Sequence, residues 1–300
     1  MVNYRDLTIT RDQLGECRPL GSGGQGRIFL VPELDLPGGG GPFVYKEYLP
    51  DGAAVSAQGM ANIISLRVSL GPEQLAWFDN HLAWPLRIVV DQDRTGDVVV
   101  GVVMRLIPAA FFEVVSLTGP RREMPREARA LFYDRARAER ENLRYPDSRE
   151  RHLLCMRLAY VIAFLHRHQI VFGDISSRNV LYRLAPTPDV LLVDCDAVRK
   201  VGTAPVVAQG HTPEFMPPDP YEPQSIGTDL FKLGMFVARI LSPGRALSVA
   251  DVDAGAPNIL EPTGARMLRA SLRREPAGRP TALDWYRYFH AITGGPNARR

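Results

Sequence analysis

The first third of the chain alternates between short apolar runs and polar turns. Runs rich in Val, Ile and aromatic residues, bounded by Gly and Pro, predict β-strands. The predicted strands cover residues 17–21, 26–31, 43–48, 85–90 and 98–104. A helical pattern over 55–82 is interrupted at Gly71-Pro72, because proline begins a helix more readily than it continues one. This region is therefore expected to form a small sheet accompanied by helices.

Helical periodicity dominates the rest of the chain. Apolar residues at a 3–4 spacing between Leu154 and Leu165 predict a core helix, and His166 and His168 suit its negatively polarised C-terminal end. A similar pattern over 230–241 predicts a second buried helix. Residues 121–144 mix charges of both signs with few apolar positions, which predicts a long exposed helix or an enlarged helix-and-loop insertion. The elements together predict the α+β class.

Composition narrows the class of protein. The 300 residues are 45% hydrophobic, enough for two packed lobes, and a net charge of +3 does not suggest a nucleic-acid partner. Three widely spaced cysteines favour a reducing compartment without disulfides. No apolar stretch has membrane-spanning length and no signal-peptide core begins the chain. We expect a cytoplasmic protein that binds neither membrane nor nucleic acid.

A glycine-rich segment runs from Leu20 to Val31. Gly21, Gly23 and Gly26 form the pattern G-x-G-x-x-G, and the residues that follow predict a strand rather than the helix of a dinucleotide-binding fold. The lysine of a P-loop does not follow Gly26, which excludes that class. The segment predicts either a flap over nucleotide phosphates or a glycine hairpin without a ligand. Lys46, on the third predicted strand, favours the flap.

Acidic and amide side chains follow at a second spacing. Asp174 precedes Asn179 by five residues on a predicted loop, and Asp194 ends the strand-like run that begins at Asp189. Phosphoryl transfer uses such a set, since one carboxylate positions the attacking hydroxyl while an amide oxygen and a second carboxylate hold Mg²⁺. This spacing alone is weak evidence for phosphoryl transfer, and the upstream glycines and Lys46 strengthen it.

In this order, the motifs resemble those of a divergent bacterial member of the eukaryotic-like Ser/Thr protein kinase superfamily, from about Leu20 to about Tyr288. Residues 212–219 resemble the end of an activation segment. Residues 227–234 resemble the start of the central helix, whose Asp229 braces the catalytic loop. Arg279 resembles the arginine that pairs with the acid of the closing segment, here Asp219.

The resemblance implies a two-lobed kinase-like α+β fold: a small antiparallel N-lobe sheet over 1–106, a mainly helical C-lobe over 107–292, and a disordered tail over 293–300. It implies ATP and Mg²⁺, or Mn²⁺, as cofactors, a Ser/Thr protein substrate, and an opposing phosphatase as a partner. Asp174, Asn179 and Lys46 would be catalytic, and Asn179 and Asp194 would bind the metal. The implied nucleotide-binding residues are Gly21, Ser22, Gly23, Gly26, Ile28, Lys46 and Met104, of which Met104 equally suits the core.

Several positions depart from the kinase pattern. Gly173 stands where many kinases have the arginine that docks a phosphorylated loop, and Ser176 stands where Ser/Thr kinases have a lysine, which leaves Arg178 as a nearby substitute. Asp196 replaces a glycine and adds a second candidate carboxylate for the metal. No acidic residue lies between 51 and 73, so Glu73 is either the partner of Lys46 or an ordinary acid of a first helical turn.

Two alternatives remain open. The departures are consistent with a pseudokinase or a nucleotide-binding scaffold that has lost catalysis. The series Gly173-Asp174 to Asn179 with a later Asp-x-Asp also resembles small-molecule kinases of the aminoglycoside or choline type. Residues 212–219, Asp229 and Arg279 argue against the second alternative, and absence of a contact between Arg279 and Asp219 would revive it.

Overall fold

The structure is a computed structural model that describes residues 3–23, 26–49, 55–93, 96–115, 122–207, 209–218, 223–245 and 247–294. The chain forms two compact units. The first comprises Met1–Pro108 and Val193–Gln209, and the second comprises Ala109–Leu192 and Gly210–Arg300. The sequence-based division at 106/107 lies two residues before this one and did not assign 193–209 to the first unit. Most of the expected tail, 295–300, lies outside the described residues.

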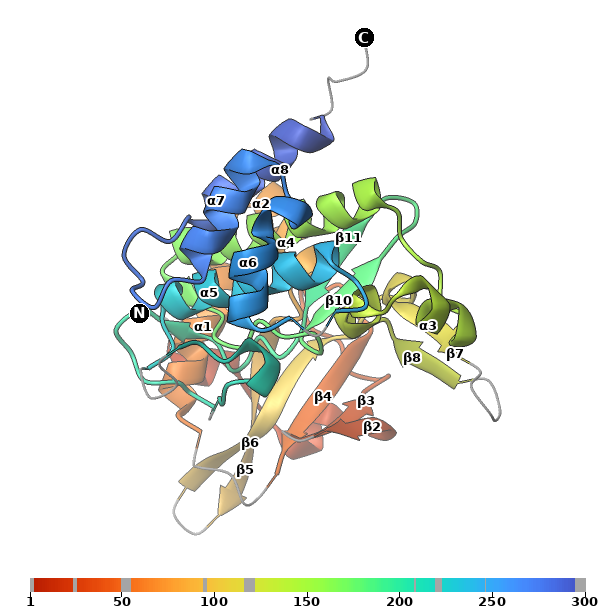
Figure 1. Ribbon diagram of the computed structural model, residues 1–300. Coiled ribbons are helices and arrows are strands. Elements are labelled where there is room, and N and C mark those ends of the chain that lie inside the picture. Colours follow the sequence, from red (N-terminus) through yellow and green to blue (C-terminus); the bar gives the residue numbers. More distant parts are fainter. Residues whose placement is uncertain are drawn as a thin grey trace. The chain divides into compact units, whose positions relative to one another are not determined.

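A six-stranded sheet forms the body of the first unit (Figure 1). Its strands are β1 (Thr8–Thr10), β2 (Arg18–Gly23), β3 (Gly26–Leu30), β4 (Phe43–Tyr48), β5 (Pro85–Asp93) and β6 (Gly96–Arg105). Their order is β1-β5-β6-β4-β3-β2, with β1 parallel to β5 and the other neighbours antiparallel. The strands predicted for this region are confirmed, while the three-residue β1 has too short a pattern to be predicted.

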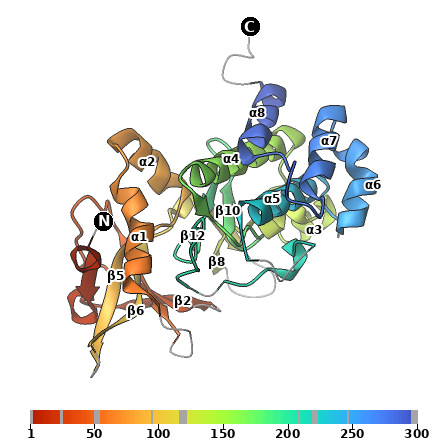
Figure 2. The same cartoon turned by 90° about the vertical axis from the view of Figure 1, so that its left-hand side faces the viewer.

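The strand register gives the two faces of this sheet different roles. Lys46 on β4 lies opposite Ile28 on β3 and Val102 on β6, so these three side chains share one face. That face packs with residues of α1 (Ala57–Val68), which lies against the sheet in Figure 2. Tyr45 and Phe43 point to the other face and join a separate apolar cluster. The helical region predicted over 55–82 is therefore confirmed, with its break before α2 (Pro72–His81).

Helices make up most of the second unit. They are α3 (Arg135–Arg140), α4 (Ser148–Arg167), α5 (Ile226–Leu241), α6 (Val249–Ile259), α7 (Pro262–Ser271) and α8 (Ala282–Thr293). Two antiparallel pairs accompany them: β7 (Phe112–Val115) with β8 (Arg122–Pro125), and β10 (Val180–Arg183) with β11 (Asp189–Leu192). The two-residue segments β9 (Ile170–Val171) and β12 (Arg199–Lys200) belong to the second and first unit respectively. The α+β class is confirmed.

Helix α5 is buried at most of its positions, including polar ones. Ser225 caps its first turn by accepting the N–H of Thr228, whose hydroxyl in turn accepts the N–H of Ser225. Two charged residues on this helix, Asp229 and Lys232, are completely buried. Burial of a charge without partners is costly, so both residues are expected to have polar partners.

Of the two alternatives for 121–144, the single long helix is wrong, and the described part of the stretch is a helix-and-loop segment. The described part of this stretch holds strand β8, a 3-10 turn at Ala128–Phe132 and the short helix α3. Pro125 and the scarcity of apolar residues at helical spacing explain the break, because neither favours a continuous helix with a buried face. None of the helices in the described ranges is long and apolar enough to cross a membrane.

Candidate functional site

The glycine-rich segment forms the hairpin of β2 and β3, with Gly21 opposite Ile28. A Cβ atom on Gly26 would clash with the carbonyl oxygen of Glu47, so packing against β4 is enough to require glycine there. At Gly21 and Gly23, in contrast, a Cβ atom would meet nothing within 4 Å. Packing within the fold therefore does not require glycine at these two positions. A glycine backbone there can approach a ligand closely, because no side chain is in the way.

Lys46 is the centre of a buried charge cluster in the first unit. Its side chain is 4% exposed, and its Nζ donates to Asp194 Oδ1 at 3.0 Å and to Asp196 Oδ1 at 2.8 Å. The two aspartates come from the segment that returns to the first unit some 150 residues later. Asp196 is fully buried, and its Oδ2 accepts the hydroxyl of Tyr48 at 3.0 Å. We call Lys46, Tyr48, Asp194 and Asp196 the Lys46 cluster.

The two carboxylates of the Lys46 cluster stabilise the charged form of Lys46. Burial lowers the pKa of Lys46, but the negative charges of Asp196 and Asp194 outweigh it, and the net pKa is raised. Burial, followed by the neighbouring Asp196, raises the pKa of Tyr48 well above its usual value, so its hydroxyl remains a donor. Burial likewise raises the pKa of the Cys195 thiol. Cys195 is thus a buried, unreactive side chain rather than a redox-sensitive one.

Asp194 has the features of a metal ligand. Its φ of 58° lies in the left-handed region, which is uncommon outside glycine and often marks a functional position. Its side chain is 35% exposed, and Oδ2 accepts no hydrogen bond from the described residues. A carboxylate oxygen that is accessible and uncommitted suits Mg²⁺. The described residues hold no group of three or more His, Cys, Asp or Glu side chains arranged for a metal ion.

The structure decides between alternatives that the sequence left open for Asp196 and Glu73. Asp196 is not a second metal candidate, because both its oxygens are occupied by Lys46 and Tyr48 and no part of it reaches solvent. Glu73 is the ordinary acid of a first helical turn and not the partner of Lys46. It is exposed at the start of α2 and forms no ion pair in the described part of the chain. Asp196 therefore supplies the buried counter-charge for which no acid is available in α1.

The second unit holds the loop from Phe172 to Asn179. Asp229, at the start of α5, accepts the backbone N–H groups of Phe172 and Gly173, each at 2.8 Å, and lies 3.1 Å from His166 Nε2. Gly173 has a φ of 85°, which glycine adopts without strain. The loop backbone is thus tied to a buried carboxylate at the point just before Asp174. His166 serves this anchor rather than only ending its helix.

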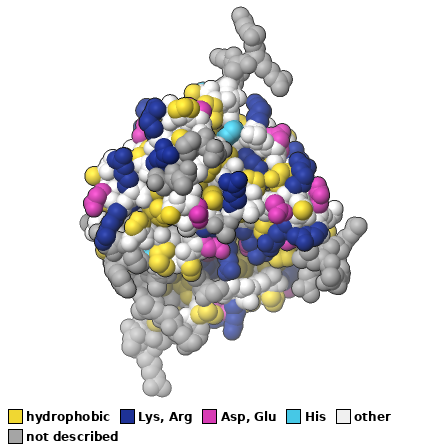
Figure 3. Space-filling model, viewed as in Figure 1, with side chains coloured by type: hydrophobic (Ala, Val, Ile, Leu, Met, Phe, Trp, Pro, Cys, Tyr) yellow, Lys and Arg dark blue, Asp and Glu magenta, His cyan; other side chains and the backbone are white. Residues whose placement is uncertain are grey.

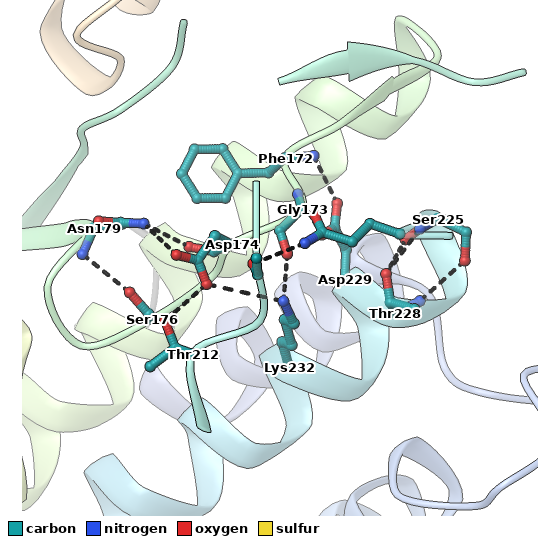
Figure 4. A network of polar contacts seen from close by, with 12 residues as sticks. Phe172, Gly173, Asp174, Ser176, Asn179, Thr212, Ser225, Thr228, Asp229 and Lys232 are labelled. Atoms are coloured by element: carbon teal, nitrogen blue, oxygen red, sulfur yellow. Dashed lines mark hydrogen bonds and ion pairs between the residues drawn. The ribbon is translucent and has the colours of Figure 1, made fainter. Parts of the chain in front are cut away.

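Two residues hydrogen-bond the side chain of Asp174, and a buried lysine forms an ion pair with it (Figure 4). Thr212 donates its hydroxyl to Oδ1 at 2.9 Å, and Asn179 donates its amide nitrogen to Oδ2 at 2.9 Å. Lys232, from α5, donates to the carbonyl oxygen of Gly173, and its Nζ lies 3.9 Å from Asp174 Oδ1. We call Asp174, Asn179, Thr212 and Lys232 the Asp174 cluster. The amide nitrogen of Asn179 is engaged, which leaves its amide oxygen for another ligand.

Lys232 is the cation beside Asp174, a place for which the sequence had suggested Arg178. The Arg178 side chain is exposed, whereas Lys232 is fully buried. Burial lowers the pKa of Lys232, and the charges of Asp174 and Asp229 offset this only in part. The sequence analysis missed Lys232, although a lysine inside an otherwise apolar helical stretch next to Asp229 is a detectable signal. The sequence analysis also did not predict that Asp196 pairs with Lys46 or that Tyr48 donates to Asp196.

The remaining predicted residues lie as follows. Ser22 is exposed on β2, and Ile28 is partly buried against the apolar cluster that contains Met104. Met104 is 6% exposed on β6, so it is a core residue whatever else it contacts. Arg279 donates to the carbonyl oxygens of Gly227, Arg273 and Arg274. Its predicted partner Asp219 lies outside the described residues.

Comparison with known proteins does not identify the chain: no family model matches it, and no curated protein matches it. The site must therefore be interpreted from its own geometry. The structure brings Lys46 together with Asp194 in the first unit, and Asp174 together with Asn179 in the second.

Proposed function

We propose that this protein is a protein kinase with a kinase-like two-lobed fold, which transfers the γ-phosphoryl group of ATP to Ser or Thr hydroxyls. The observation that carries the proposal is the contact of Lys46 with Asp194 at 3.0 Å, across 148 positions of the chain. A buried lysine that meets an accessible carboxylate, in the unit that also has a glycine hairpin with open space, suits a triphosphate with its metal ion.

The first unit supplies the groups for the nucleotide. The open positions at Gly21 and Gly23 allow backbone N–H groups to approach phosphate oxygens. Lys46 stays charged, because its pKa is raised, and it can orient the α- and β-phosphates. Asp194, with its uncommitted oxygen, would hold Mg²⁺, and Asn179 of the second unit would offer its amide oxygen to the same kind of ion. When bound, the metal ion would neutralise charge on the phosphate oxygens.

The second unit supplies the groups for the acceptor hydroxyl. Thr212 and Asn179 fix the carboxylate of Asp174, so that it can accept the hydrogen bond of a substrate hydroxyl in one orientation. The ammonium group of Lys232 lies 3.9 Å from Asp174 Oδ1, where it compensates negative charge. Phosphoryl transfer depends mainly on positioning and charge compensation, and the contacts of Asp174 support the proposal because they suit both tasks.

The test is phosphoryl transfer from radiolabelled ATP, measured with the wild-type protein and with Asp174→Ala, in Mg²⁺ and in Mn²⁺. Autophosphorylation and transfer to a library of Ser- and Thr-containing peptides are scored. We expect turnover to fall about 10²- to 10⁴-fold, the range that a positioned acid–base group supplies. Binding of a fluorescent ATP analogue should remain, since Asp174 serves the acceptor.

Asp35→Ala is the matched control, because Asp35 is exposed in the first unit and takes no part in either cluster. Its turnover should equal that of the wild type. ATP binding without transfer by the wild-type protein would instead identify a nucleotide-binding scaffold. Transfer to small hydroxyl compounds, with none to peptides, would identify a small-molecule kinase.

A further inference from the structure

A large cavity opens beside Asp174 within the second unit. Its volume is about 880 Å³, and Asp174 and Thr212 form part of its wall. Five arginines also line it: Arg129, Arg137, Arg178, Arg239 and Arg245. One wall comes from the start of α3, and Figure 3 shows dark blue side chains gathered over the position of that helix. The concentration of guanidinium groups next to the proposed acceptor position is the starting point of the inference.

Three of these arginines already have an acidic neighbour. Arg129 pairs with Glu127, Arg137 with Glu141 and Arg239 with Glu214. Arg178 and Arg245 are exposed and form no ion pair with any residue in the described ranges. A guanidinium group is always charged and presents a planar set of donors that matches a carboxylate. These two arginines are therefore available to a ligand.

The acids in the cavity wall do not cancel this charge. Asp134 accepts the backbone N–H of Arg137 and so caps α3, while Glu214 pairs with Arg239. Asp174 is engaged by Thr212, Asn179 and the charge of Lys232. Arg129, Arg137 and Arg239 are neutralised by their partners, so the positive charge left in the wall is that of Arg178 and Arg245. Such a surface attracts negatively charged partners and repels basic ones.

We propose that this cavity selects the protein substrate: it binds an acidic segment in which Asp or Glu residues flank the accepting Ser or Thr. The inference rests on the proposed function, since it is Asp174 that assigns the acceptor hydroxyl to this wall. Arg178 follows Asp174 by four residues and meets a carboxylate close to the acceptor, and Arg245, beyond the end of α5, meets one farther along the segment. The accepting hydroxyl then lies at Asp174.

The experiment uses the full chain and four synthetic peptides that differ only around one serine. The flanking residues are acidic, neutral, basic or phosphorylated. Transfer is measured as kcat/KM, and binding is measured by fluorescence anisotropy with the same peptides carrying alanine in place of the serine. We expect the acidic peptide to exceed the basic peptide by about tenfold or more in both measurements, with the preference weakening as salt increases.

Charge reversal at one arginine tests the assignment. Arg245→Glu should weaken binding of the acidic peptide by about tenfold and improve binding of the basic one, whereas Arg245→Lys should keep most of the affinity. Arg149→Glu is the matched control, because Arg149 is exposed on the first turn of α4 and lies outside the cavity. It changes the net charge equally and should leave the peptide preference unaltered.

Several outcomes would overturn the proposal. These are equal treatment of acidic and basic peptides, equal effects of Arg245→Glu and Arg149→Glu, and a preference for the phosphorylated peptide over the acidic one. The proposed function can fail separately. If no peptide accepts phosphate but the alanine-containing acidic peptide binds through Arg245, the docking surface stands and the kinase activity does not. If peptides accept phosphate without a preference for acidic flanking residues, the kinase activity stands and the docking surface does not.

Discussion

Two buried lysines, one in each unit, show how differently the same side chain is used. Lys46 is 4% exposed and Lys232 is fully buried, so both pay the cost of leaving water. Lys46 contacts two carboxylates at 2.8 and 3.0 Å, and its pKa is raised. Lys232 has a backbone carbonyl and a carboxylate at 3.9 Å, and its pKa is lowered. Burial alone therefore does not decide the charge; the number and distance of acidic partners does.

This difference has opposite consequences with pH. Because the folded pKa of Lys46 exceeds its ordinary value of 10.5, its contribution to stability is complete below that pH and is lost only as pH rises through the raised pKa. For Lys232 the folded pKa lies below 10.5, and the unfolded chain binds the proton more tightly. Its contribution therefore becomes more favourable as pH rises from the lowered pKa toward 10.5. Lys46 therefore keeps its proton to a higher pH than an ordinary lysine, and Lys232 loses its proton at a lower one.

The largest effect is expected when the Lys46 cluster is broken. Lys46→Met leaves the carboxylate of Asp196 fully buried beside Tyr48 without a cation. Loss of one partner of a buried ion pair costs about 3–5 kcal/mol, which urea unfolding of the full chain would measure. Phosphoryl transfer should be lost as well.

The double variant Lys46→Met/Asp196→Asn separates the two losses. The asparagine oxygen still accepts the hydroxyl of Tyr48, but no buried charge remains unpaired. We expect most of the stability to return while transfer stays absent. A single variant as stable as the wild type would show that Asp196 is not the counter-charge of Lys46.

An intermediate effect is expected at Lys232. Lys232→Met removes the charge beside Asp174 and should lower turnover roughly 10- to 100-fold at neutral pH, the size of a lost electrostatic contact near a reacting group. The decisive measurement is the pH profile. Wild-type turnover should decline on the alkaline side, below pH 10.5, as Lys232 loses its proton, and this decline should be missing from the variant. Identical profiles would assign Lys232 a purely structural role.

The smallest effects come from the hydroxyl groups that complete each cluster. Tyr48→Phe removes one hydrogen bond from the buried Asp196 and should cost about 1.5 kcal/mol of stability with little change in turnover. Thr212→Val removes one from the more accessible Asp174 and should cost less stability, about 1 kcal/mol, but more turnover. Urea unfolding and steady-state kinetics on both variants give the comparison. The reverse order would mean that the roles of the two clusters have been exchanged.

Local pattern was enough to predict much of the first unit. The strands around Lys46 carry β-branched and aromatic runs between turn residues, and each is confirmed. The β7–β8 pair was not predictable, because Arg122–Pro125 lies in a stretch dense with charge and carries no clear alternation. Strand β1 is too short for a pattern to emerge.

Lys46 and Asp174 could be predicted as site residues from the sequence, but most of the residues that contact them could not. Asp174 and Asn179 lie together because both belong to one short loop. The partners Asp196 and Lys232 depend on tertiary contacts, across 150 positions for Lys46 and Asp196 and 58 for Asp174 and Lys232. Periodicity reports which face of an element is buried, but it does not report which distant residue meets it.

The return of Val193–Gln209 to the first unit sets a rule for dissecting this protein. A fragment that ends at Pro108 would contain every strand of the six-stranded sheet, yet it would deprive Lys46 of both carboxylates. Excision at an apparent boundary would thus produce a sheet with a buried, uncompensated ammonium group. A fragment meant to represent the first unit therefore has to include Val193–Gln209 as well as Met1–Pro108.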